Sequence, residues 1–193
     1  MEYKILSTNT LDVKEIYHLM ISGISPRPIA FVGSSDSDGN HNLAPYSFYN
    51  GFGANPPIVG FSPALSGRTG EPKDTLVNIQ KTNFFTISLV TYSMVHQMSL
   101  SSSEYEKNID EFCKSGFNKF ICNNNMPAVD ESPLIMSCSL YDILKLGNKP
   151  ASGNLILGKV EEFYVDNSVY KNGKIDPYSL DPVSRMGYNF YSR

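Results

Sequence analysis

Residues 25–32 read SPRPIAFV and, after an Asp38-Gly39 turn, residues 42–50 read NLAPYSFYN. The first run is apolar and rich in β-forming residues, and Asp-Gly is a favoured turn between two strands, so this stretch predicts a β-hairpin. The return arm mixes small residues, amides and hydroxyl groups with aromatic rings. That combination suits a flat ligand laid against strand backbone, and a flavin is the flat ligand it indicates.

A second polar element follows about one strand further along the chain. Residues 73–79 read KDTLVNI, and the leucine and isoleucine are spaced for one face of a helix with Asp74 as its N-cap. A helix N-terminus carries unpaired N–H groups and partial positive charge, so Lys73 and Thr75 beside it predict a phosphate site. A platform for a flavin ring followed by a phosphate site describes an FMN-binding protein.

Four short motifs carry a resemblance to a known family. They are SPRPIA at residues 25–30, NLAPYS at residues 42–47, KDT at residues 73–75 with Asn78, and RMGY at residues 185–188. Each motif is short, but here all four occur together in the family's order and spacing. The chain resembles the flavin reductase-like family, which has the FMN-binding split-barrel fold, and the resemblance runs through almost the whole chain.

Composition predicts one globular domain spanning residues 1–193. A length of 193 residues is usual for one compact unit, and a hydrophobic content of 41% is enough for a sizeable core. A net charge of −3 argues against a nucleic-acid partner, because a phosphate-backbone binder carries a basic stripe. No segment approaches the ~20 apolar residues of a membrane-spanning helix, and the first residues lack a signal-peptide pattern. We therefore expect a cytoplasmic protein with no membrane partner.

Cysteine and histidine form no pattern typical of a metal site. Cys113, Cys122 and Cys138 are too few and too scattered for a disulfide framework or a thiolate site, so we expect reduced thiols. The three histidines share no ligand-like spacing, and no metal is predicted. The sequence also lacks a Ser-His-Asp order, a paired-carboxylate signature and a reactive-cysteine motif, so it assigns no catalytic residue.

The rest of the chain predicts many strands and a few helices. Helices are expected at residues 13–20 and 93–100, with a short one at residues 110–113 that Gly116 ends. Strands are expected at residues 29–33, 43–47, 58–61, 84–90, 134–146 and 155–165, with a small hairpin at residues 169–175. This order favours a closed or partly open antiparallel barrel, and the resemblance supplies the name split barrel for this mainly β fold.

The resemblance also implies which residues contact the cofactor. Those on the ring or ribityl side are Ser25, Arg27 and Pro28, and those at the isoalloxazine are Asn42, Ala44, Pro45 and Ser47. Those at the phosphate are Lys73, Thr75 and Asn78, with Arg68 as a helper, and those reaching the site from the C-terminal tail are Arg185 and Tyr188. Arg27 has a second interpretation as a strand-edge salt-bridge residue. The aromatic residues Tyr46, Phe48 and Tyr49 are secondary candidates for stacking, with simple core packing as the alternative.

Three functions fit an FMN-binding barrel. FMN carries the redox step itself, so few acid–base residues are needed. The first function is an NAD(P)H-dependent flavin oxidoreductase; NADH or NADPH would dock transiently, because no G-x-G-x-x-G lies between a strand and a helix. The second is a flavoredoxin-like electron carrier reduced by a redox partner protein, and the third is a non-enzymatic flavin-binding module. The resemblance further implies a homodimer with flavin sites near the subunit interface.

Overall fold

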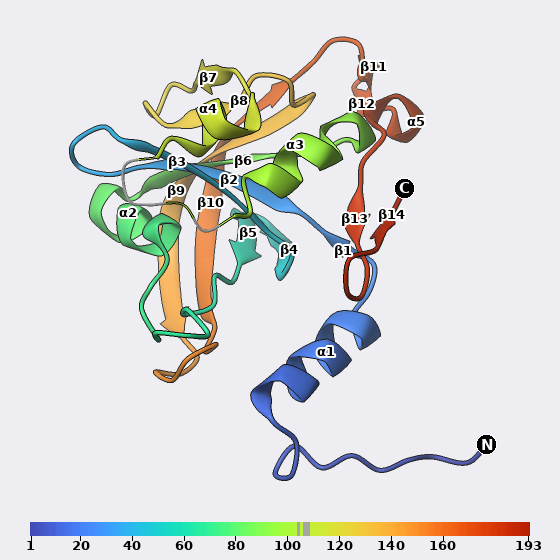
Figure 1. Ribbon diagram of the computed structural model, residues 1–193. Coiled ribbons are helices and arrows are strands. Elements are labelled where there is room, and N and C mark those ends of the chain that lie inside the picture. The colour runs from blue at the N-terminus through green and yellow to red at the C-terminus, as the bar shows by residue number, and fades with distance from the viewer. Residues whose placement is uncertain (104, 106–108) are drawn as a thin grey trace.

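The computed structural model describes residues 1–103, 105 and 109–193 (Figure 1). Among these residues, the largest sheet is antiparallel and has seven strands in the order β3-β2-β6-β9-β10-β5-β4. Its strands are β2 Ala30–Ser35, β3 His41–Tyr46, β4 Tyr49–Ala54, β5 Pro57–Phe61, β6 Phe84–Ser88, β9 Leu134–Lys145 and β10 Asn154–Val165. This order matches the antiparallel arrangement that the sequence predicts.

Smaller ladders and short helices surround this sheet. The ladders are β1 Arg27–Pro28 with β13 Ser184–Arg185 and β14 Tyr191–Ser192, β7 Lys119–Ile121 with β8 Pro127–Val129, and β11 Tyr170–Lys171 with β12 Lys174–Ile175. The helices are α1 Val13–Gly23, α2 Asp74–Thr82, the 3-10 turn η1 Tyr92–Met94, α3 Val95–Leu100, α4 Glu111–Ser115 and α5 Pro177–Leu180. Figure 1 shows the turn between β13 and β14 close to one end of α1, with both strands away from the long strands β9 and β10.

Strand β2 separates two hydrophobic cores. Ala30 and Val32 belong to one core, which also contains Leu76 and Ile79 of α2. Phe31 lies between them in the chain and belongs to the other core, together with residues of α3 and α4. Side chains alternate between the two faces of a strand, so β2 is buried on both sides. This burial explains why residues 30–33 of the strand include no polar side chain instead of alternating with polar residues.

The two edge strands of the sheet, β3 and β4, follow each other in the chain. Only Ser47 and Phe48 connect them, so Tyr46 and Tyr49 are no more than about 11 Å apart. The sheet must therefore curl until its opposite edges approach. The strand order nevertheless contains no ladder between β3 and β4 among the described residues, so the curled sheet stays open along that seam.

The long strands and helices α1 to α4 follow the sequence predictions, whereas α5 and some other short features were not predicted. The helix expected at residues 13–20 is α1, and the helix expected to end at Gly116 is α4, with Gly116 at φ 75°. The predicted N-cap of α2 is wrong: Lys73 occupies that position and Asp74 is the first helical residue. Strand β4 was not predicted, because its glycine-rich, exposed sequence gives no alternating apolar signal.

Helix α1 packs mainly by its C-terminal end. Asp12 and Glu15 form a capping box at its start, which satisfies two backbone N–H groups. Within the helix only Ile21 is buried, whereas Val13 and Tyr17 are among several exposed apolar side chains. Across the part of the chain described here, no helix has the length and apolar character needed to cross a bilayer.

Candidate functional site

Hydrogen bonds connect the return arm of the hairpin to the start of α2. Asn42 Nδ2 donates to Thr75 Oγ1 at 2.8 Å, and Tyr46 Oη donates to the same oxygen at 2.9 Å. Asn42 and Tyr46 are four residues apart on β3 and therefore lie on one face of that strand. The residues that the sequence assigned separately to a ring and to a phosphate thus belong to one arrangement of side chains.

This arrangement extends one strand further into the sheet. Ser34 on β2 accepts hydrogen bonds from Asn42 Nδ2 at 3.4 Å and from Asn78 Nδ2 at 3.3 Å. We call Ser34, Asn42, Tyr46, Thr75 and Asn78 the polar cluster. Four of its side chains are buried, from fully in Ser34 to 8% exposed in Tyr46. Their hydrogen bonds offset the cost of removing these groups from water.

Burial keeps Tyr46 in its neutral form. Desolvation raises the pKa of its phenol far above the ordinary value of about 10, which outweighs the lowering effect of the hydrogen bond to Thr75. Its ring packs against Phe61 with centroids 5.2 Å apart. Tyr46 therefore acts as a fixed hydrogen-bond donor within the core.

The start of α2 is available to bind an anion. Its N-cap, Lys73, makes no side-chain capping hydrogen bond, and the Lys73 side chain is exposed. The first N–H groups of a helix have no partner within the helix, and they carry partial positive charge. Arg68 lies on the exposed loop that precedes the helix. Of the predicted phosphate residues, Lys73 and Thr75 thus lie at the helix terminus, Asn78 lies further along α2, and Arg68 lies on the loop before it.

Arg27 holds together three segments that are distant in the sequence. Its side chain is buried, with only 4% of the residue exposed. Its guanidinium donates to the carbonyl oxygens of residues 21, 24 and 186, the second at 2.6 Å and the third at 3.1 Å. Its Nε donates to Ser47 Oγ at 3.3 Å. These partners are carbonyls and a hydroxyl, not the carboxylate of a strand-edge salt bridge, and burial lowers the pKa of the guanidinium.

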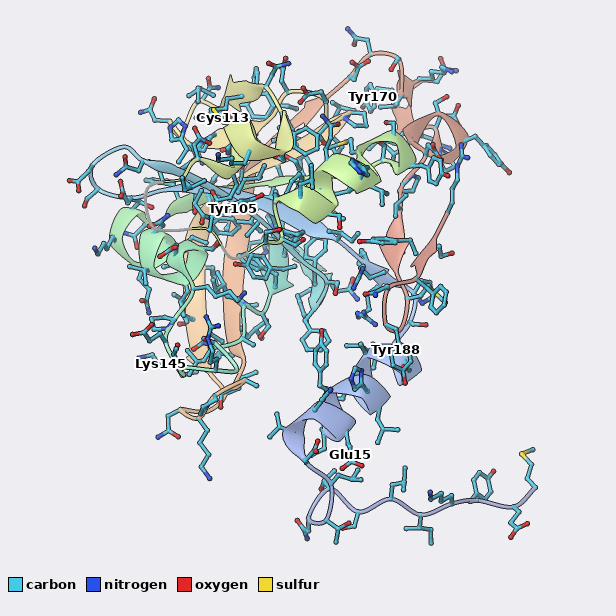
Figure 2. All side chains as sticks on the ribbon, viewed as in Figure 1. Glu15, Tyr105, Cys113, Lys145, Tyr170 and Tyr188 are labelled. Atoms are coloured by element: carbon cyan, nitrogen blue, oxygen red, sulfur yellow. The ribbon has the colours of Figure 1, made fainter. Side chains whose placement is uncertain are left out.

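The other predicted residues near Arg27 surround the turn between β13 and β14. Ser25 Oγ donates to Met186 Sδ at 3.7 Å, and Pro28 is exposed on β1. Arg185 donates to the carbonyl of Tyr188 at 2.9 Å. Tyr188 stacks on His18 of α1 with centroids 5.1 Å apart, and Figure 2 shows it at this turn, next to the helix.

Residues of the polar cluster line parts of two cavities. A cavity of about 450 Å³ is lined by Asn42 and Asn78, together with charged residues of α2, α4 and β7. Another of about 330 Å³ is lined by Pro45, Tyr46, Ser47, Arg185 and residues of α3. The second cavity brings residues of two separate motifs together. Among the described residues, Lys73, Arg68, Ala44, Ser25, Arg27, Pro28, Thr75 and Tyr188 lie outside the lining of both cavities.

Sequence reasoning missed Glu111 and Ser34. Glu111 Oε2 accepts a hydrogen bond from the backbone N–H of Leu43 at 3.1 Å, at the open edge of β3. Burial raises the pKa of this carboxyl. The two residues are 68 positions apart, so no local pattern could indicate their contact. Ser34 has a weak signal, since a serine that continues an apolar, buried strand needs a hydrogen-bond partner.

Comparison with known proteins identifies similar chains that match along nearly the whole length. A structure of nitrilotriacetate monooxygenase component B from Bacillus cereus is 29% identical, with a TM-score of 0.93 over 100% of this chain and 96% of that chain. A Shewanella frigidimarina structure, described as a flavin reductase with a split barrel domain, is 29% identical, with a TM-score of 0.81 over 95% and 90% of the two chains. An uncharacterized Halalkalibacterium halodurans protein is 33% identical over 97% of this chain and 91% of its own length.

A family model supports the same relationship. The model described as a flavin reductase like domain matches residues 22–179, a span that contains α2, the polar cluster and most of the predicted site residues. The likeness to a split-barrel structure confirms the mainly β, split-barrel fold that the sequence predicted. Because the family model covers well over half of the sequence, the chain belongs to the flavin reductase-like domain family.

Proposed function

We propose that this chain is an FMN-binding oxidoreductase that transfers hydride from NADH or NADPH to flavin. The observation that carries the proposal is the pair of hydrogen bonds from Asn42 and Tyr46 to Thr75. They connect the strand assigned to the flavin ring with the helix assigned to the phosphate. Family membership supports flavin chemistry, and the donor and the FMN cofactor are the specific parts of the proposal.

The residues at the start of α2 fit a phosphate group. Lys73 supplies a positive charge there, and the uncapped first turn supplies N–H donors. Thr75 is only 1% exposed, so its side chain serves mainly to hold this turn in place, and its backbone lies at the helix terminus. Arg68 adds a second cation from the neighbouring loop.

The second cavity fits a flat ring and a donor that approaches it. Pro45 of β3 and Ser47, just after that strand, provide one wall, and Arg185 provides a cation from β13. A guanidinium in this wall favours an anionic donor, and pyridine nucleotides carry phosphates. FMN would accept hydride and pass electrons on, while the protein orients the ring and admits the donor.

We also propose that the chain works as one domain in a cytoplasmic homodimer. Exposed apolar side chains on α1, including Val13, Tyr17 and Met20, support a second copy as the partner that covers them. Analytical ultracentrifugation at micromolar concentration should give the mass of a dimer. A monomer under those conditions would contradict this part of the proposal.

The activity is tested by the visible spectrum of the FMN-loaded protein under anaerobic conditions. NADH is added to one sample and NADPH to another. The preferred donor should bleach the flavin band rapidly. Free FMN at the same concentration is the control for reduction without protein. A bound-flavin band that neither nucleotide bleaches would refute the reductase and favour an electron carrier reduced by a redox partner protein.

The phosphate assignment is tested separately with Lys73→Ala. Loss of this charge should weaken FMN binding by about 1–3 kcal/mol, because charge-assisted hydrogen bonds to the phosphate are lost. The affinity for riboflavin, which has no phosphate, should not change. Lys145→Ala, which removes an exposed lysine at the end of β9, is the matched control and should leave both affinities unchanged.

A further inference from the structure

We propose that Tyr46 is a positioning residue that sets the preference for FMN over riboflavin. Its hydroxyl acts through Thr75, which it holds at the start of α2, and Tyr46 itself contacts no phosphate. This inference rests on the FMN site proposed above and goes beyond it, because it assigns the phosphate selectivity to a residue in the core.

The hydroxyl of Thr75 receives two donors. A threonine hydroxyl has two acceptor sites and one donor proton, and Asn42 and Tyr46 occupy both acceptor sites. Thr75 is also β-branched, so its side chain has few rotamers available in a helix. With both acceptor sites occupied, the first turn of α2 is held in one position relative to β3.

The two donors come from different points along β3. Asn42 and Tyr46 are four residues apart, or about 14 Å along an extended strand. Both hydrogen bonds end on Thr75 Oγ1, so together they hold that oxygen from two directions, whereas a single hydrogen bond leaves it freer to shift. Without the Tyr46 hydroxyl, Thr75 Oγ1 would accept a hydrogen bond from Asn42 alone.

Tyr46 is suited to this role because its own position is fixed. The ring belongs to the hydrophobic core and packs against Phe61, and only 8% of the residue is exposed. Its phenol stays neutral because burial raises its pKa, so it remains a donor at physiological pH. The helix terminus is therefore held in place by a residue of the rigid core and not by a surface loop.

The consequence for binding concerns the phosphate alone. Lys73 is the N-cap residue, two positions before Thr75, and Leu76 N donates to the carbonyl of Lys73 at 3.0 Å. The cation and the N–H groups of the first turn therefore move together with Thr75. A flavin without a phosphate does not use these groups, so its affinity should not depend on how they are held.

The experiment compares FMN and riboflavin binding to the full chain and to its Tyr46→Phe variant, by quenching of flavin fluorescence. Phenylalanine keeps the ring and removes only the hydroxyl. We expect the ratio of riboflavin Kd to FMN Kd to fall about threefold to tenfold, the equivalent of one hydrogen bond. The riboflavin Kd should stay at the wild-type value.

Tyr164→Phe is the matched control. It also removes a hydrogen-bonded phenol from the sheet, since Tyr164 Oη accepts from the N–H of Asn123 at 3.0 Å, but it lies outside the polar cluster. The proposal would be overturned if the ratio of riboflavin Kd to FMN Kd changed by the same factor in Tyr46→Phe and in Tyr164→Phe. Equal weakening of both ligands in Tyr46→Phe would also overturn it, because that indicates a merely structural role.

A second measurement covers the case in which Tyr46→Phe is poorly folded. The amide of Val77 donates to the carbonyl of Lys73 at 3.2 Å. Its hydrogen exchange should be faster in the variant than in the wild type, whereas the exchange of amides in β9 and β10 should be the same in both proteins. Uniformly faster exchange would contradict a local effect on α2.

If the wild-type chain binds FMN no better than riboflavin, the proposed phosphate site itself fails. If it prefers FMN and the variant keeps that preference, only the role of Tyr46 fails.

Discussion

Replacing Thr75 with valine tests whether the polar cluster stabilises the fold. Valine has the same shape, so the change replaces one hydroxyl with a methyl group and leaves two donors without their acceptor. Tyr46 is 8% exposed, and its hydroxyl donates to Thr75. In the variant this buried hydroxyl has lost its acceptor, which costs about 1–3 kcal/mol of desolvation. Asn42 keeps its longer contact to Ser34 and should lose about 1 kcal/mol or less.

The expected total is a loss of about 1–4 kcal/mol from the free energy of unfolding. A folded domain typically has a free energy of unfolding of about 5–15 kcal/mol, so this loss is a substantial part of it. Urea unfolding followed by circular dichroism measures it as a lower midpoint with an unchanged slope. Thr82→Val is the matched control on the same helix, because Thr82 Oγ1 bonds a helical carbonyl and is half-buried. If Thr75→Val costs no more than Thr82→Val, the reasoning about buried donors is refuted.

Three other changes probe separate features. Arg27→Met should lower stability by about 2–4 kcal/mol, because it leaves buried carbonyls unpaired; faster proteolysis within residues 1–24 would show that α1 is released, and unchanged proteolysis would contradict the role of Arg27. Gly33→Ala places a Cβ 1.9 Å from the carbonyl oxygen of Pro127 and should abolish soluble expression, whereas Gly51→Ala, which meets nothing within 4 Å, should express normally. Because burial raises the folded-state pKa of Glu111, the wild-type chain should lose stability as pH rises from the ordinary glutamate pKa through the raised one. Glu111→Gln should remove that loss in urea unfolding across pH, and identical pH profiles would refute the assignment.

Much of the fold could be predicted because it depends on local patterns. The runs that became β9 and β10 are long and bounded by glycine and proline, and α4 ends at a glycine that adopts a left-handed conformation. Strand β4 could not be predicted, because residues 49–54 contain two glycines and are mostly exposed. It forms a strand through its ladder with β5, which is a tertiary effect.

The candidate site was predictable as a set of motifs but not as an arrangement. Lys73 and Thr75 were placed at a helix start by capping and spacing rules, although the N-cap residue itself was assigned one position too late. The contact between Asn42 and Thr75 joins residues 33 positions apart, and no periodicity within either segment indicates it. Which of these side chains touch a cofactor stays a prediction, since the motifs alone supply that assignment.

The contacts of Arg27 have a consequence for the order in which the chain assembles. Arg27 reaches the carbonyl of Met186, 159 residues further along, and closing so long a loop is entropically costly until the intervening sheet has formed. We therefore expect the segments around Arg27 and Met186 to come together late, after the strands between them have paired. Loss of the final hairpin and loss of the first helix should then give the same defect, namely a folded sheet whose ends are left unattached.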